Sequence, residues 1–185
     1  MYFAASGRQN TENTLNLARK RAGELGINEV VLASSTGDTA MAALEVFSGF
    51  RVTVVTYHCG FKKPFESVMK NETAEKLKDR GAAVVMATHA LSGVERSLAN
   101  RFSGPYPVLL VAETLRLFGQ GTKVAVEVAI MAADAGALSG RDIVSIGGTG
   151  RGADTALVIK PAGQSGLFDM RIREIICKPR NFEEK

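Results

Sequence analysis

Residues 30–40 have the sequence Val30-Val31-Leu32-Ala33-Ser34-Ser35-Thr36-Gly37-Asp38-Thr39-Ala40. The apolar half of this stretch predicts a strand over 29–34 that is buried on both faces, as parallel strands are. The hydroxyl-rich half predicts a turn into a helix over 39–47, with Asp38 as its N-cap. A second apolar run over 51–57 completes a right-handed strand–helix–strand unit. Such a unit is typical of an open α/β sheet.

The alternation of helices and strands continues on both sides of this unit. We expect a helix over 11–25, which Thr11 caps and Gly26 ends. Further helices are expected over 73–80, 107–118 and 122–137, with Gly119-Gln120-Gly121 as a breaker between the last two. Further strands are expected over 82–87, 142–146, 155–159 and 171–177. The pattern predicts one domain over residues 1–185, a three-layer α/β/α fold with a mostly parallel, mixed sheet.

The composition is that of an ordinary globular protein, with 45% hydrophobic and 23% charged residues in a chain of 185. The net charge of +4 is spread along the chain. It suits anionic ligands in general, and a mildly basic solvated surface explains it equally, so no nucleic-acid partner is expected. The two cysteines, Cys59 and Cys177, lie outside any metal-binding pattern. With no signal sequence and no apolar run near the ~18 residues of a membrane span, we expect a cytoplasmic protein without a membrane partner.

The turn between the first strand and its helix is a candidate anion site. Its hydroxyls and the free N–H groups of the helix donate hydrogen bonds, and the helix dipole favours an anion there. We therefore predict a small phosphorylated ligand, bound by Ser34, Ser35, Thr36, Gly37, Asp38 and Thr39. The alternative is that these side chains only cap a helix that follows a strand.

A second glycine-rich stretch, residues 147–154, also follows a predicted buried strand. A guanidinium beside a loop rich in donors makes a good phosphate clamp. Its candidate binding residues are Gly148, Thr149, Gly150, Arg151 and Gly152. A plain hairpin loop is the alternative. Neither stretch matches the P-loop or the Gly-x-Gly-x-x-Gly dinucleotide motif, so classical nucleoside triphosphate and NAD sites are disfavoured.

Histidines follow two of the predicted strands and are candidates for a shared pocket. His58 and His89 are the two histidines of the chain, and Cys59 lies beside the first. They would provide groups that titrate near neutral pH. The alternative is that each histidine closes a strand end with a hydrogen bond. No serine-hydrolase elbow is present, so the sequence leaves enzymatic activity open.

Two motifs, in the same order, resemble the C-terminal domain of pyruvate kinase. The segment 34–40 and the strand after it resemble that domain's Thr-x-Ser-Gly-Arg-Ser-Ala segment and its succeeding strand. The segment 140–152 resembles its Gly-Asp-x-Val strand and glycine-rich loop. In allosteric pyruvate kinases these segments bind a sugar bisphosphate, so the resemblance implies a phosphate pocket shared by residues 34–39 and 148–152.

Three further segments extend the resemblance to small stand-alone, mostly archaeal proteins that look like this domain alone: Asn10-Thr11-Glu12-Asn13-Thr14, Thr88-His89-Ala90-Leu91-Ser92-Gly93-Val94-Glu95-Arg96 and Leu115-Arg116-Leu117-Phe118-Gly119-Gln120-Gly121-Thr122-Lys123. Members of that family are associated with bound flavin mononucleotide (FMN). The resemblance implies an FMN phosphate at Ser35–Thr39 and an FMN ring near two strand ends, with contacts from His58, Cys59, Gly60, Phe61, Thr88 and His89. It also implies self-association, because the kinase domain packs against copies of itself.

Two departures limit what the resemblance implies. Asp38 stands where the kinase pattern has arginine, and its carboxylate would repel a second phosphate unless it turned outward. Phosphoryl transfer belongs to the kinase's (β/α)₈ barrel, which needs ~250 residues, so we do not expect a functional pyruvate kinase. The sequence therefore predicts an FMN-binding protein of unknown role. The alternatives are a regulatory module for another phosphorylated metabolite and a structural subunit without a ligand.

Overall fold

The computed structural model describes residues 1–181, which form a seven-stranded sheet in the order β1-β7-β6-β5-β2-β3-β4. The strands are β1 (Tyr2–Ala5), β2 (Glu29–Ala33), β3 (Arg51–Tyr57), β4 (Ala83–Ala87), β5 (Ile143–Gly147), β6 (Thr155–Lys160) and β7 (Arg171–Asn181). Strands β5, β2, β3 and β4 run parallel, whereas β6 is antiparallel to both of its neighbours. The predicted mixed, mostly parallel sheet is confirmed.

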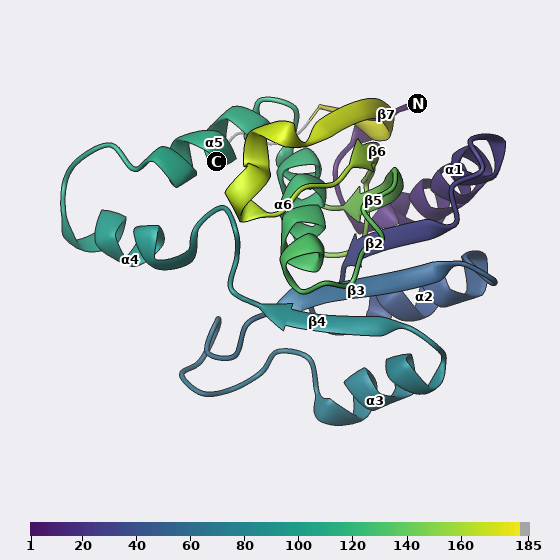
Figure 1. The fold of residues 1–185 in the computed structure, drawn as a ribbon, viewed down its shortest axis with the longest axis horizontal. Coiled ribbons are helices and arrows are strands. Elements are labelled where there is room, and N and C mark those ends of the chain that lie inside the picture. Colours follow the sequence, from purple (N-terminus) through teal and green to yellow (C-terminus); the bar gives the residue numbers. More distant parts are fainter. Residues whose placement is uncertain (182–185) are drawn as a thin grey trace.

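Helices cover both faces of this sheet (Figure 1). They are η1 (Arg8–Asn10), α1 (Thr11–Glu24), α2 (Asp38–Val46), α3 (Asn71–Asp79), α4 (Gly93–Arg101), α5 (Pro107–Arg116), α6 (Gln120–Asp134) and η2 (Gln164–Asp169). One apolar core lies between the sheet and α1, α2 and α3, and a second lies between the sheet and α5 and α6. The three-layer α/β/α prediction is therefore confirmed. Across residues 1–181, no helix is both long and apolar enough to cross a membrane.

Strand β2 shows why its sequence is a continuous apolar run. Val30 and Leu32 belong to the core under α1 and α2, whereas Val31 belongs to the core under α6. Successive side chains of a strand point to opposite faces, so a central strand with helices on both sides needs an apolar residue at every position. The loops at its carboxyl end are thereby held on a rigid base.

The predicted cap of α1 is wrong. Thr11 is the first helical residue, and Asn10 occupies the N-cap position without a side-chain capping bond. The Thr11 hydroxyl donates to the Arg8 carbonyl oxygen at 2.7 Å and accepts from the Ala153 N–H at 3.1 Å. Thr11 therefore ties the start of α1 to the distant glycine-rich loop.

The predicted cap of α2 is wrong for a similar reason. Gly37, in a left-handed conformation, occupies the N-cap position, and Asp38 is the first helical residue. The hydroxyl oxygen of Ser34 accepts the N–H of Ala40 at 3.3 Å and so satisfies one of the free donors of this helix end. Only glycine fits at position 37, because φ is 104° and an ideal Cβ there would lie 2.4 Å from Thr73 Cγ2.

The predicted breaker before α6 is also wrong in part, because the helix begins at Gln120 and includes Gly121 in its first turn. An ideal Cβ at Gly121 would lie 2.2 Å from Thr155 Oγ1 and 2.4 Å from Asp154 Oδ1. Glycine is needed here for close packing of the helix against β6. It does not end a helix at this position.

Candidate functional site

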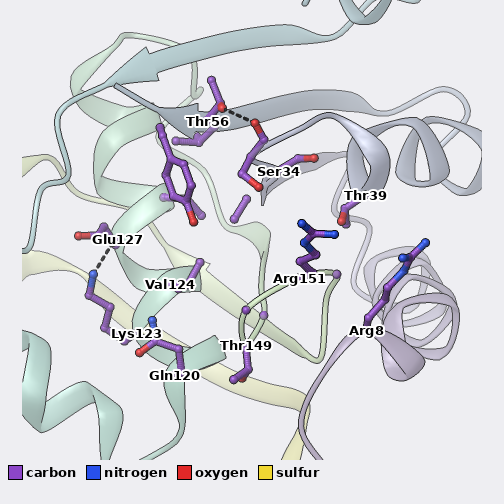
Figure 2. Close-up of a pocket in the computed structure, with 18 of the residues that line it drawn as sticks. Arg8, Ser34, Thr39, Thr56, Gln120, Lys123, Val124, Glu127, Thr149 and Arg151 are labelled. Atoms are coloured by element: carbon purple, nitrogen blue, oxygen red, sulfur yellow. Dashed lines mark hydrogen bonds and ion pairs between the residues drawn. The ribbon is translucent and has the colours of Figure 1, made fainter. Parts of the chain in front are cut away.

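A cleft of about 1780 Å³ opens beyond the carboxyl ends of β2 and β3. Its walls come from the turn before α2, the start of α1, the inner side of α6 and the loop between β5 and β6. Figure 2 shows side chains from these segments directed toward a common space. Open α/β sheets bind ligands in this position, because loops from neighbouring strands meet there.

The turn before α2 forms one side of the cleft. Ser34 and Thr39 are nearly buried, at 5% and 8% exposure, while Thr36 is exposed. No acceptor for the backbone N–H of Asp38 or of Thr39 is found within residues 1–181. These two N–H groups and the nearby hydroxyls give the turn several hydrogen-bond donors for an anion.

The β5–β6 loop lies against this turn and is organised by a buried carboxylate. Asp154 is fully buried, and its Oδ2 atom accepts the N–H groups of Gly7 at 3.0 Å and of Thr149 at 3.2 Å. Its Oδ1 atom accepts the hydroxyl of Thr155 at 2.8 Å. The prediction did not include Asp154, although an acidic residue between a glycine-rich loop and a β-branched strand was a visible signal.

The glycine-rich loop approaches the N-terminal segment very closely. An ideal Cβ at Gly152 would lie 2.4 Å from Thr11 Oγ1 and 2.8 Å from Arg8 Cα. The Thr149 hydroxyl is shielded from solvent and has no hydrogen-bond partner in the described part of the chain. The loop thus offers the cleft its backbone and the Arg151 side chain, and it does not offer that hydroxyl.

Two exposed guanidinium groups stand beside the turn over residues 34–39. Arg8 and Arg151 both line the cleft, and Figure 2 shows them close to Thr39. Neither guanidinium has an ion-pair or hydrogen-bond partner among the described residues. Arg151 was predicted, but Arg8 was not. The position of Arg8 depends on the contact between the N-terminal segment and the glycine-rich loop, and no local sequence pattern reveals this contact.

Asp38 also lines the cleft, as an exposed carboxylate. Its Oδ2 atom accepts the hydroxyl of Thr36 at 3.2 Å. The carboxylate therefore stays near the turn, where it would disfavour a ligand with two adjacent phosphates.

Aromatic side chains from two strand ends form a stacked cluster at another part of the cleft. The ring of Phe61 stacks on Tyr57, with centroids 4.1 Å apart, and on His89, with centroids 4.8 Å apart. The Nδ1 atoms of His58 and His89 are 3.3 Å apart. The two histidines thus lie together, but His58 does not line the cleft, so the predicted pocket shared by both histidines is not found there. The rings that line the cleft are those of Tyr57, Phe61 and His89.

The surroundings of His89 favour its neutral form. Burial lowers its pKa, the carboxylate of Glu127 opposes this shift, and the positive charges of Lys123 and Arg96 add to the lowering. A neutral imidazole can both donate and accept a hydrogen bond, which suits contact with an uncharged ligand group.

A buried ion pair on α6 also faces the cleft, and the prediction did not include it. The side chains of Lys123 and Glu127 are only 5% and 4% exposed, and they pair across one helical turn. Burial lowers the pKa of Lys123, although the carboxylate of Glu127 opposes this shift. The spacing of four residues was a readable signal for such a pair.

The structure brings together most of the predicted binding residues around this cleft: Ser34, Ser35, Thr36, Asp38, Thr39, Phe61, His89, Gly148, Thr149, Gly150, Arg151 and Gly152. The others do not line it: Gly37, His58, Cys59, Gly60 and Thr88. Gly37 faces α3 instead, and His58 lies behind the cleft wall, in contact with His89 and Phe61.

Comparison with known proteins identifies the family. The model of the pyruvate kinase alpha/beta domain matches residues 12–159. Among solved structures, the chain is similar to a pyruvate kinase from Cryptosporidium parvum, with a TM-score of 0.41 and 14% sequence identity. That match covers 80% of this chain and 22% of the kinase chain. Because the family model matches most of its length, the chain belongs to the pyruvate kinase alpha/beta domain family.

Proposed function

We propose that this protein binds FMN, with the phosphate held between the 34–39 turn and the 148–152 loop. The observation that carries the proposal is a single cleft that joins an anion-binding end to an aromatic cluster. At the anion end, the N–H groups of Asp38 and Thr39 and the guanidinium groups of Arg8 and Arg151 all lack partners within residues 1–181. These donors fit a phosphate monoester.

The remaining part of the cleft fits a large planar group. The whole cleft, with a volume of about 1780 Å³, exceeds the ~300–1,000 Å³ of most small-molecule sites and so has room beyond the anion end. Phe61 and His89 provide aromatic surface, and Val124 and Val128 on α6 provide apolar surface. FMN would supply electron-transfer chemistry when bound, while the chain orients the ring and excludes water from it.

The proposal is tested by retention of flavin. Purified protein should be yellow, or should take up added FMN, and FMN at ~100 times its dissociation constant should stabilise the fold by about 2.7 kcal/mol. Thr36→Asp places a negative charge on the exposed turn and should abolish this binding without unfolding the protein. Ser165→Asp, an exposed position in η2, none of whose residues lines the cleft, is the matched control. Wild-type protein that neither retains nor gains stability from FMN would refute the proposal.

A second candidate function is a regulatory module for another phosphorylated metabolite, without catalytic activity of its own. The observation that favours it is a third exposed arginine on the cleft, Arg96 of α4, which also lacks a partner in the described chain. Three free guanidinium groups suit a ligand with separated anionic groups better than a monophosphate. Thermal-shift screening of phosphorylated metabolites beside FMN discriminates the two functions, because the tighter ligand gives the larger stabilisation.

A further inference from the structure

The buried pair Lys123–Glu127 calls for a functional explanation. Both residues lie on α6, where their neighbours along the helix are apolar and buried. Taking two charges out of water costs free energy, and replacing a buried ion pair with apolar residues is often neutral or stabilising. Packing of α6 against the sheet would therefore be served at least as well by two apolar side chains.

Among the described residues, the hydrogen-bonding groups of the Glu127 side chain all have partners, whereas not all of those of Lys123 do. Glu127 uses both oxygens, because Oε1 accepts the N–H of Leu91 at 3.0 Å and Oε2 accepts from Lys123 Nζ. A lysine ammonium has three N–H donors, and within residues 1–181 Glu127 is the one acceptor found for Lys123. Two N–H donors of a nearly buried cation on the cleft wall thus remain available to a ligand.

The pair lies away from the phosphate end of the cleft. Figure 2 shows Lys123 and Glu127 on one side of the cleft and Arg8, Thr39 and Arg151 on the other. A ligand whose phosphate lies beside Arg8 and Arg151 would therefore direct its opposite end toward α6.

We propose that Lys123 anchors the non-phosphate end of the ligand by donating hydrogen bonds to a carbonyl-type oxygen. Glu127, one helical turn further along α6, holds the ammonium group in position and neutralises its charge. This inference rests on the proposed FMN function. For FMN, the acceptor would be a carbonyl oxygen on the pyrimidine part of the flavin ring.

The test compares FMN with inorganic phosphate as probes. The double variant Lys123→Met with Glu127→Gln removes both charges, and the glutamine keeps an acceptor for the N–H of Leu91. A hydrogen bond to a charged group contributes about 1.5–3 kcal/mol, so FMN should bind about 10-fold to 100-fold more weakly. Stabilisation by inorganic phosphate in a thermal-shift assay should be unchanged. Lys76→Met, on the exposed side of α3, is the control for loss of a lysine and should bind both probes normally.

A second variant keeps the inference testable if the double variant does not fold. Lys123→Arg keeps a cation beside Glu127, but its planar guanidinium cannot place donors at the same positions, so FMN affinity should also fall. Wild-type affinity for FMN in a folded variant of either kind would overturn the inference and leave FMN binding intact. Wild-type protein that gains stability from phosphate but not from FMN would overturn the proposed function, and this inference with it.

Discussion

The Nδ1 atoms of His58 and His89 lie 3.3 Å apart, so the two rings share one hydrogen-bond contact between neighbouring strand ends. One Nδ1 donates and the other accepts, which requires that at least one ring be neutral. Burial lowers the pKa of His89, and the nearby charge of Lys123 adds to this effect. A lowered pKa favours the neutral form of His89, which is compatible with this contact.

A pH dependence of stability follows from this arrangement. In the unfolded chain the histidine has its ordinary pKa of 6.5, whereas in the folded protein the pKa of His89 is lower. Between these two values the unfolded state binds more protons, so the free energy of unfolding should fall as the pH drops below about 6.5, by at most about 1.4 kcal/mol per pH unit. The contribution of His89 should be constant above that range. Urea unfolding of wild type and of His89→Gln checks this, and equal pH slopes for the two proteins would contradict it.

Asp154 is expected to be the residue that contributes most to holding the glycine-rich loop in its conformation. Asp154→Asn keeps the shape of the side chain but replaces one acceptor of the fully buried group with a donor, so that the N–H of Gly7, the N–H of Thr149 or the hydroxyl of Thr155 loses its partner. The free energy of unfolding should fall by about 2–4 kcal/mol, and FMN affinity should fall because the loop is no longer held.

The control for this variant is Asp142→Asn. Asp142 pairs with Arg173 at 3.2 Å at an exposed site, where an ion pair contributes little. Its stability should change by less than about 0.5 kcal/mol in the same chemical denaturation experiment. Similar losses for the two variants would mean that Asp154 is not a special support of the loop.

Close packing of α6 against β5 gives a third prediction. An ideal Cβ at Gly147 would lie 2.2 Å from the Gly121 carbonyl oxygen and 2.7 Å from the Ala125 nitrogen, and these backbone atoms cannot move as a side chain can. Gly147→Ala should therefore destabilise the protein by about 1–3 kcal/mol or more. Gly23→Ala in α1 meets only the end of the Arg19 side chain, at 3.3 Å, and should be neutral or stabilising by up to about 1 kcal/mol. Thermal unfolding of both variants measures the difference.

The central strands and their helices could be predicted because local patterns determine them. The run Val30–Ala33 must be apolar to be buried on both faces, and the hydroxyl-rich turn after it marks the helix start. The helix α4 was missed although Val94 and Leu98 stand at helical spacing, because the helix has only 9 residues and none of them is buried. Strand β1 was missed because it is a short edge strand that pairs only with the end of β7, and its burial is slight.

The candidate site was predictable where one segment supplies several donors, and was not predictable where distant segments meet. Residues 34–39 and 148–152 each carry a local signal. Arg8 carries no such signal, and the local pattern marks Asp154 as an acidic residue without revealing its role. Both roles depend on the contact between the N-terminal segment and the glycine-rich loop. Lys123 was missed for a different reason, although its spacing from Glu127 indicates an ion pair. In an alanine- and valine-rich helix a lysine is expected to lie on the solvent side, and only the fold shows that this helix is buried almost all round.

The two arginines beside the 34–39 turn, Arg8 and Arg151, give the last prediction, which separates a phosphate clamp from a diffuse positive surface. Arg8→Ala and Arg151→Ala remove exposed side chains without partners in the described chain, so each should change stability by less than about 0.5 kcal/mol. Each should weaken FMN binding by about 10-fold, because a charge-assisted hydrogen bond to phosphate is lost. Titration calorimetry at low and high salt measures this. Arg101 is an exposed arginine outside the cleft, so Arg101→Ala should weaken FMN binding only slightly, and only at low salt, through the loss of one distant positive charge. If Arg101→Ala weakened binding as much as Arg151→Ala, the phosphate would be held by the overall charge of the protein, and residues 148–152 would not form its binding site.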